Sequence, residues 1–352
     1  MRSFVFGGLP GRVVFGPGSI AKLKTEVEAL GVKRVLMLST PGRAGMVSRI
    51  AEPLKGMLAG VFDQAVMHTP IEKVNAAREM ARSLGADCCV AIGGGSTIGF
   101  GKAIAATSGI PVLAVPTTYS GSEMTTLYGI SEGRTKKTQR DPRVLPRTVI
   151  YDPELTVGLP PETSAASGMN AIAHCAEALY AHDGNPVVSL MAEEGIRALA
   201  SSLPKIISNG SNLEERGNAL YGAWLAGCTI STTSVALHHK LCHVLGGFGL
   251  PHAETHSVVL PHALAYNRAA ATEAMQRIAR ALGETDAPAG MWNLERKLPL
   301  AMDLRSLGMK EADIESAARI AVEAPYPNPR RVEYEPLLGL LRAAYSGQAP
   351  RS

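Results

Sequence analysis

Short apolar runs alternate with helical segments over roughly the first 150 residues, and this alternation constrains the fold more than any other feature. Runs rich in strand-forming residues occupy 34–39, 61–67, 88–92, 111–115 and 147–151. Helical patterns separate them, at 20–31, 43–58, 72–84 and 99–108. A continuous apolar strand between helices is typical of a parallel sheet that is buried on both faces. The sequence therefore predicts an α/β fold that begins with a doubly wound, mostly parallel sheet.

Two further segments are expected to form hairpins. Near the N-terminus, residues 4–6 and 12–15 are strand-forming and glycines lie between them, which predicts a pair of strands joined by a turn. The charged segment 132–141 is expected to be a surface hairpin whose lysines and arginines are partly solvated.

From about residue 155 the sequence changes to alanine-rich helical patterns without strand signals. These patterns cover 161–182, 186–203, 213–231, 234–245, 255–265, 271–282, 288–299, 310–323 and 334–345. We therefore expect two domains, a nucleotide-binding α/β domain at 1–154 and an all-helical domain at 155–352. The active site is expected in the cleft between them.

Composition and charge narrow the functional classes. The net charge is +4 over 352 residues and no long basic run occurs, so a nucleic-acid partner is not expected. No segment approaches the roughly 20 apolar residues of a membrane span, and the first residues lack a signal-peptide pattern. The five cysteines form no C-x-x-C pair and lie among apolar neighbours, which favours reduced thiols. A cytoplasmic protein that acts on a small molecule is therefore expected.

Two loops at predicted strand ends have the residues needed to bind a dinucleotide. The first is Gly93, Gly94, Gly95 and Ser96, which leads directly into a helix. Glycines let the backbone approach a pyrophosphate, and the helix N-terminus supplies free N–H groups. The second loop follows the next predicted strand and offers the hydroxyls of Thr117, Thr118, Ser120 and Ser122. Because the two strands are expected to be neighbours, one nucleotide could contact both loops.

The end of the strand 34–39 bears on the choice between NADH and NADPH. An acidic side chain there would bind the ribose 2′-hydroxyl and repel a 2′-phosphate. Ser39 is neutral and Arg43 lies close by, which predicts that NADPH is accepted alongside NADH. Lys137, in the charged segment, is a further candidate cofactor-binding residue.

Residues 238–262 contain six of the nine histidines in the chain. His239 and His243 are four residues apart, so in a helix their rings share one face. His252 follows a Gly-Gly break and a proline. Imidazole is well suited to bind a metal or to move a proton near neutral pH, so these three histidines indicate a site. His256 and His262 are interpreted as structural histidines.

These motifs together resemble the iron-containing (group III) alcohol dehydrogenase family. The resemblance rests on the following segments, in the family's order: Gly-Gly-Gly-Ser at 93–96 with Lys-Ala-Ile at 102–104, Pro-Thr-Thr at 116–118 with Ser-Glu at 122–123, Asp-Pro-Glu-Leu-Thr at 152–156, Leu-Pro at 159–160, Gly-Met-Asn-Ala-Ile-Ala-His at 168–174, His239-x-x-x-His243 and Pro251-His252. The resemblance implies a nucleotide-binding domain, a helical domain and a homodimer.

In that family a metal is held by an aspartate and three histidines, and the matching positions here are Asn170, His174, His239 and His252. His243 matches a histidine beside the nicotinamide. Asn170 departs from the pattern because a carboxamide removes the only formal negative charge from the ligand set. This departure resembles a branch of the family that reduces the carbon–carbon double bond of a dianionic oxo acid with NADH or NADPH. The resemblance to this branch implies that no metal is required.

The chemistry of that branch gives each site residue an expected role. Conjugate hydride addition builds up an enolate, which imidazoles can stabilise and protonate. His243 and His252 are the leading proton donors, while His239, His174 and Asn170 complete a polar pocket. A dicarboxylate substrate also needs a cation, for which the candidates are Lys240, Lys136, Arg140 and Arg330.

Three other functions fit parts of the pattern. One is a metal-dependent alcohol or polyol dehydrogenase in which Asn170 still binds the metal. Another is an enzyme similar to dehydroquinate synthase, which uses NAD transiently and binds a phosphorylated sugar acid. The third is a non-catalytic protein that binds a nucleotide or a metal.

Overall fold

The computed structural model describes residues 4, 6–8, 11–67, 69–133, 135–323 and 326–350. The chain divides into two compact units. The α/β unit contains the described residues of 8–159, and the helical unit contains those of 160–350 together with residues 4, 6 and 7.

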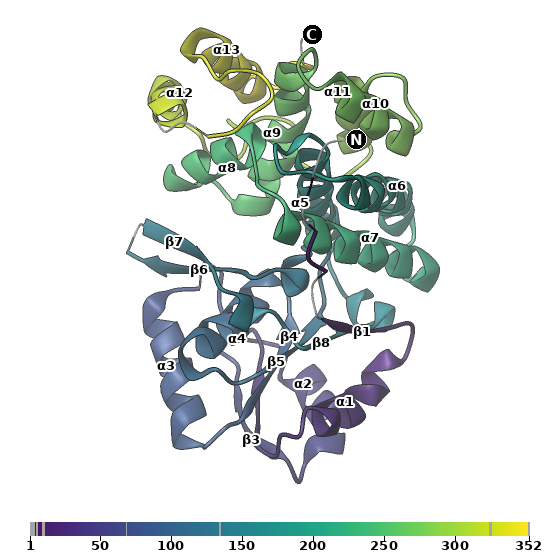
Figure 1. The fold of residues 1–352 in the computed structure, drawn as a ribbon, viewed down its shortest axis with the longest axis vertical. Helices are drawn as coiled ribbons and strands as arrows, with labels where there is room; N and C mark the ends of the chain where they lie inside the picture. Colours follow the sequence, from purple (N-terminus) through teal and green to yellow (C-terminus); the bar gives the residue numbers. More distant parts are fainter. Residues whose placement is uncertain are drawn as a thin grey trace. The chain divides into compact units, whose positions relative to one another are not determined.

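The α/β unit is built on a six-stranded parallel sheet with the order β1-β8-β5-β4-β2-β3 (Figure 1). The strands, in this order, are β1 (Arg12–Phe15), β8 (Thr148–Tyr151), β5 (Val112–Pro116), β4 (Cys88–Gly93), β2 (Val35–Leu38) and β3 (Leu58–Phe62). Every residue of β2, β4, β5 and β8 is buried, as expected for strands that are covered on both faces. The predicted doubly wound sheet is therefore confirmed.

Helices cover both faces of this sheet. The helices α1 (Leu23–Ala29) and α2 (Ala44–Ala51) pack their apolar residues against one face, in a core that includes Val35 and Val90. On the other face, α4 (Gly95–Ser108) lies so close that a Cβ atom on Gly101 would be 3.2 Å from Val112. The helix α3 (Ile71–Ser83) packs beside α4. The antiparallel pair β6 (Leu127–Glu132) and β7 (Thr135–Arg140) forms a hairpin, which begins five residues before the charged segment expected at 132–141.

Three expected elements of the α/β unit are wrong. β1 is an edge strand that pairs in parallel with β8, and residues 4 and 6 are not in a strand, so the expected hairpin with 4–6 is not found in the described residues. Val5 lies outside the described residues. The strand expected at 61–67 is β3, which ends at Phe62 because Ala65 donates its backbone N–H to the Ser39 carbonyl. The helix expected at 43–58 ends at Ala51, where Pro53 starts a short 3-10 turn.

The helical unit is built around α5, which packs against several other helices, α10 among them. Its helices are α5 (Pro161–Tyr180), α6 (Pro186–Ser208), α7 (Leu213–Thr232), α8 (Leu237–Gly247), α9 (His252–Asn267), α10 (Thr272–Leu282), α11 (Ala287–Glu295), α12 (Ile314–Glu323) and α13 (Tyr334–Tyr345). α5 contacts α6, α7 and α9, and most of its residues are buried. α6 continues five residues past the predicted end at 203, so Pro204 lies inside it at the cost of one backbone hydrogen bond.

The division between the units follows Leu159, slightly beyond the predicted boundary at 154. Asp152 explains why the intervening residues stay with the α/β unit. Its carboxylate accepts hydrogen bonds from the backbone N–H groups of Gly18 (3.2 Å) and Ile20 (3.0 Å), and also from Glu154 (3.0 Å). Within the described residues, no helix has the length and hydropathy needed to cross a membrane.

Glu295, at the end of α11, is a buried carboxyl group whose Oε1 has no hydrogen-bond partner within the described structure. Burial raises its pKa well above the usual range. A group with a raised acidic pKa binds a proton in the folded state that the unfolded state releases, so stability falls as pH rises above the unfolded pKa of about 4.3.

Glu295→Gln is therefore expected to raise the melting temperature at pH 8, by about 2 °C or more, and to change it much less at pH 4.5. Differential scanning calorimetry at both pH values measures the effect. Glu284→Gln, at an exposed position in the same unit, is the matched control. A melting temperature that is unchanged at pH 8 would contradict the prediction.

Candidate functional site

The glycine loop and the hydroxyl loop lie against each other in the α/β unit. β4 ends at Gly93 and α4 begins at Gly95, while the hydroxyl loop follows the neighbouring strand β5. The Thr117 backbone N–H donates a hydrogen bond to the Gly93 carbonyl (3.0 Å). A Cβ atom on Gly94 would stand 2.9 Å from the Thr118 side chain, so this close approach requires glycine. The structure thus brings together the two loops that the sequence predicts.

The serines of the hydroxyl loop face the first turn of α4. A Cβ atom on Gly95 would lie 3.4 Å from Ser120 Oγ and 3.6 Å from Ser122 Cβ. Ser96 is the second residue of α4 and is partly exposed. The first turn of α4 is thus surrounded by hydroxyl groups, which suits an oxygen-rich ligand such as a pyrophosphate.

Lys102 holds the hydroxyl loop in place through hydrogen bonds from its buried side chain. This role was not predicted from the sequence. Its buried ammonium group donates to Ser122 O (2.6 Å), Thr125 Oγ1 (2.8 Å) and Leu127 O (2.9 Å). Burial lowers the pKa of Lys102, and the Glu123 carboxylate opposes that shift. Burial likewise raises the pKa of Glu123, which accepts a hydrogen bond from the Tyr151 hydroxyl (2.8 Å).

The other two candidate cofactor residues are Ser39 and Lys137. Ser39 is at the same end of the sheet as the glycine loop, because Leu38 of β2 pairs with Ala91 of β4. Ser39 follows β2 and is fully buried, and its hydroxyl has no hydrogen-bond partner within the described structure. Lys137 lies on β7, where its exposed side chain pairs with Glu132 at 3.0 Å. No acidic side chain occupies position 39, which is the feature that bears on cofactor choice.

Histidines from three helices gather in the helical unit. Ring centroids are separated by 5.1 Å for His174–His239, 6.3 Å for His239–His243 and 6.5 Å for His243–His252. Two histidines that the sequence analysis had not assigned to the site join them: His256 lies 4.4 Å from His252, and His238 lies 4.8 Å from His256. The histidine cluster is therefore His174 on α5, His238, His239 and His243 on α8, and His252 and His256 on α9. His262 is packed against Trp292 (6.0 Å) instead.

Glu177, on the buried α5, orients this cluster. Its carboxylate accepts hydrogen bonds from His239 Nδ1 (2.6 Å) and from the backbone N–H groups of Ala236 (2.9 Å) and His238 (2.8 Å). With its proton on Nδ1, His239 has a lone pair on Nε2, which is buried and unpaired within the described structure. A carboxylate behind an imidazole is a common arrangement at metal sites. The sequence analysis missed Glu177, although it lies three residues after His174 on the same helix face.

Burial keeps the inner imidazoles neutral. It lowers the pKa of His238 to about 4 and that of His239 to about 3, and it lowers the pKa of His174 and His256 well below the usual range. Neighbouring histidines lower these pKa values further because two imidazolium ions would repel each other. A neutral imidazole has one nitrogen lone pair, which is the form that binds metals.

The donor atoms of the cluster suit a divalent transition metal. Several buried donors have no hydrogen-bond partner in the described structure: Asn170 Oδ1, His174 Nδ1, His239 Nε2 and both ring nitrogens of His256. His238, His239 and His256 each offer a ligand atom within 4.8 Å of the other two. Imidazole nitrogens together with a carboxamide oxygen are acceptable ligands for iron or zinc. The residues present therefore fit a metal.

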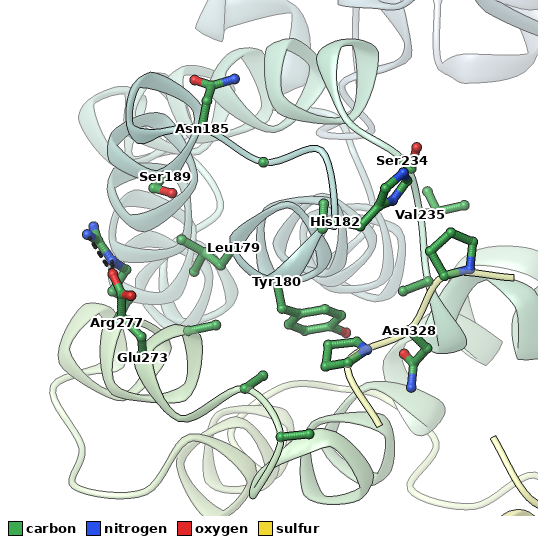
Figure 2. Close-up of a pocket in the computed structure, with 18 of the residues that line it drawn as sticks. Leu179, Tyr180, His182, Asn185, Ser189, Ser234, Val235, Glu273, Arg277 and Asn328 are labelled. Atoms are coloured by element: carbon green, nitrogen blue, oxygen red, sulfur yellow. Dashed lines mark hydrogen bonds and ion pairs between the residues drawn. The ribbon is translucent and has the colours of Figure 1, made fainter. Parts of the chain in front are cut away.

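A separate cavity of about 740 Å³ lies in the helical unit (Figure 2). It is lined by the ends of α5 and α6, by Ala270–Ala274 and by Pro327–Pro329, and none of the clustered histidines lines it. Tyr180 links its wall to the cluster, because the Tyr180 hydroxyl lies 3.4 Å from Glu177 Oε1. The Arg277 guanidinium at its edge is paired with Glu193 at 3.1 Å.

Two family models match nearly the whole chain. The model described as "Iron-containing alcohol dehydrogenase" matches residues 10–153, and the model of the "Fe-containing alcohol dehydrogenase family, C-terminal" matches residues 164–345. The chain therefore belongs to the iron-containing alcohol dehydrogenase family.

Relatives that are similar to this chain over nearly its whole length have a name that is more specific than the family name. A maleylacetate reductase from Burkholderia cepacia is 55% identical over 351 residues, covering 99% of this chain and 100% of that protein. One from Sphingobium indicum is 52% identical, covering 99% of both chains. Among solved structures, maleylacetate reductase from Agrobacterium tumefaciens is similar with a TM-score of 0.96 and 45% identity, covering 99% of this chain and 100% of that one.

The expectation that no metal is required is wrong. The matching family is iron-containing, and solved structures of iron-containing members are similar to this chain, one from Corynebacterium glutamicum with a TM-score of 0.94 and 43% identity over 98% of this chain and 97% of that one. Iron is therefore expected, and the unpaired donors of the histidine cluster are consistent with it.

Proposed function

We propose that this chain is a maleylacetate reductase, which reduces the carbon–carbon double bond of maleylacetate to give 3-oxoadipate. Relatives with this name are 44–55% identical over nearly the whole chain. The observation that carries the proposal within the structure is the cluster of six histidines, with Asn170 one helical turn before His174 on α5. It combines metal-binding donors with imidazoles that can hold a proton.

The cofactor, NADH or NADPH, is proposed to bind at the two loops of the α/β unit. The pyrophosphate would contact Gly94, Gly95 and Ser96 at the first turn of α4, where N–H groups are free. Thr117, Thr118, Ser120 and Ser122 would donate hydrogen bonds to phosphate or ribose oxygens. Hydride transfer requires the nicotinamide to reach a substrate at the histidine cluster during turnover.

The chemical step is a conjugate reduction. When bound, the reduced nicotinamide would supply the hydride for the double-bond carbon β to the ketone. The electron pair of that double bond would then move toward the carbonyl to give an enolate. A proton then goes to the α carbon, so the enzyme consumes one NADH and one proton for each 3-oxoadipate formed. We propose that His243 supplies this proton, because it is exposed on α8 whereas His239 is buried. The expected second donor, His252, is instead assigned to the iron.

Asn170, His174, His239 and His252 would hold the iron. When bound, the ion supplies a Lewis acid that polarises the substrate ketone. Glu177 keeps the proton of His239 on Nδ1 and thus fixes the orientation of that ring.

The direct test is an assay of NADH consumption with maleylacetate, using enzyme loaded with ferrous iron. We expect one NADH to be consumed for each 3-oxoadipate formed. The specific rival is a metal-dependent alcohol or polyol dehydrogenase, because 1,3-propanediol oxidoreductase has a similar structure, with a TM-score of 0.91 and 29% identity over 98% of this chain. Reduction of NAD by diols without any reduction of maleylacetate would favour that rival.

Cofactor choice provides a further prediction. With a neutral residue at position 39, kcat/KM for NADH and NADPH is expected to differ by less than about tenfold, which corresponds to about 1.4 kcal/mol. Initial rates with each cofactor at saturating maleylacetate measure the ratio. A thousandfold preference for either cofactor would contradict this expectation.

Two broader properties complete the proposal. The dependence on a reduced nicotinamide and the five free cysteines support a cytoplasmic location. The homodimer that the family resemblance implies can be tested by light scattering after size-exclusion chromatography.

A further inference from the structure

The proposed substrate carries two carboxylates, so its binding site needs a compensating positive charge. Of the four candidate cations, Lys136 and Arg140 lie on β7 in the α/β unit, whereas Lys240 and Arg330 belong to the helical unit with the histidines. Arg330 is already engaged, because its guanidinium stacks 4.3 Å from the centre of the Tyr266 ring and Nη1 donates to Tyr266 O (3.3 Å). Lys240 is the remaining candidate in this unit.

Lys240 lies on the same helix as three members of the cluster. It follows His239 on α8 and precedes His243 by three residues, a spacing that puts Lys240 and His243 on neighbouring parts of one helix surface. Its side chain is partly buried, and among the described residues its ammonium group forms no hydrogen bond or ion pair. Instead it stands 5.8 Å from the centre of the Tyr326 ring. An aromatic face can hold a cation in place without neutralising its charge.

Tyr326 presents an unused donor beside this cation. Its hydroxyl is buried and has no hydrogen-bond partner in the described structure, and its ring packs against the apolar core that contains Leu237 and Leu241 of α8. Burial raises the pKa of Tyr326, and nearby Glu177 raises it further. The phenol therefore keeps its proton, and its O–H group is available to donate a hydrogen bond to an acceptor. An unpaired buried hydroxyl is unfavourable, and an incoming carboxylate would remove that cost by accepting its hydrogen bond.

We propose that Lys240 and Tyr326 form the subsite that binds one carboxylate of the substrate. The ammonium group supplies a charge-assisted hydrogen bond and the phenol supplies a second donor, which together match two carboxylate oxygens. The inference rests on the proposed function for the identity of the substrate. The subsite itself would bind a carboxylate of any acid that fits the site.

The kinetic test uses the iron-loaded, full-length enzyme. Lys240→Met is expected to raise KM for maleylacetate about 10- to 100-fold, as loss of a charge-assisted pair predicts, while KM for NADH stays within about twofold. Lys240→Arg should recover most of the loss because it restores the charge. Tyr326→Phe should raise KM by about tenfold. Lys297→Met, which removes an exposed lysine of the same unit, is the matched control and should have no effect.

A binding test separates this inference from the proposed function, because it does not need turnover. Isothermal titration with adipate uses a dianion of the same chain length as the substrate, and hexan-1-ol is the uncharged control of equal length. Wild type should bind adipate, and Lys240→Met should bind it at least about tenfold more weakly, while any binding of hexan-1-ol should not change. If Lys240→Met loses affinity for adipate but the wild type does not reduce maleylacetate, the subsite is supported and the proposed function is contradicted. Equal affinity of wild type and Lys240→Met for adipate would overturn the subsite.

Discussion

His243→Ala is expected to lower kcat for maleylacetate by about 10²- to 10⁴-fold, the range that removal of a positioned general acid produces. His243 is exposed on α8, and its ring is nearly parallel to that of His252, with an interplanar angle of 11° and 6.5 Å between centroids. Burial keeps the inner histidines of the cluster neutral, as the lowered pKa of His239 indicates. At neutral pH they therefore lack the additional proton that an imidazolium would donate to an enolate. A more exposed imidazole can take a proton from solvent and deliver it.

The affinity for NADH separates this role from a general loss of structure. Because His243 belongs to the helical unit, the nucleotide loops should be unaffected and the Kd for NADH should stay within about threefold, as measured by fluorescence quenching. His182→Ala is the control, since His182 is an exposed histidine of the same unit that lies outside the cluster. Unchanged turnover in His243→Ala would remove this residue from the mechanism. A parallel collapse of NADH binding would indicate misfolding instead.

Much of the fold could be predicted from the sequence because its strands are buried on both faces. The runs at 88–92 and 111–115 correspond to β4 and β5, where continuous apolar residues leave little ambiguity. β3 was misplaced because its sequence, LAGVF, is only partly buried and its apolar neighbours extend beyond it. The pairing of β1 with β8 joins residues far apart in the chain, which local turn signals cannot reveal.

For the candidate site too, local spacing can be predicted from the sequence, whereas contacts between distant segments cannot. The i, i+4 spacing of His239 and His243 is visible in the sequence, and so are the two loops that meet in the α/β unit. The places of His238 and His256 depend on how α8 packs against α9, and no local spacing indicates that. Lys102 acts through three acceptors that are 20 or more residues away in the chain. Such contacts exist only in the folded molecule.

The mistaken expectation about the metal has a physical origin in α5. Asn170 removes a negative charge, and the sequence analysis treated this loss as decisive. A carboxylate nevertheless lies two turns further along the same helix, at Glu177, and reaches the cluster through His239 at 2.6 Å. A carboxylate that accepts a hydrogen bond from a metal-binding imidazole makes that imidazole more basic and therefore a better metal ligand. The motif that suggested a metal-free site contains only the direct ligands, so the contribution of Glu177 is not visible in it.

Glu177→Gln is expected to weaken iron binding by about 10- to 100-fold and to lower kcat, the effect typical of removing a carboxylate behind a metal-binding imidazole. Glu177 receives three N–H donors, from Ala236, His238 and His239, and offers only acceptor oxygens to them. A glutamine must place its own NH₂ group against one of these donors. Either His239 then changes tautomer and loses its Nε2 lone pair, or a buried N–H loses its partner at a cost of about 1–3 kcal/mol.

Cobalt(II) titration followed by absorbance measures the loss of metal affinity without relying on turnover, and NADH affinity should remain unchanged because the nucleotide loops lie in the other unit. Glu162→Gln, at an exposed position in the first turn of the same helix, is the matched control. The two possible routes of damage differ in their thermal signature. A change of tautomer leaves the melting temperature nearly constant, whereas an unpaired buried N–H lowers it. Wild-type metal affinity and turnover in Glu177→Gln would show that orientation of His239 by a carboxylate is not needed here.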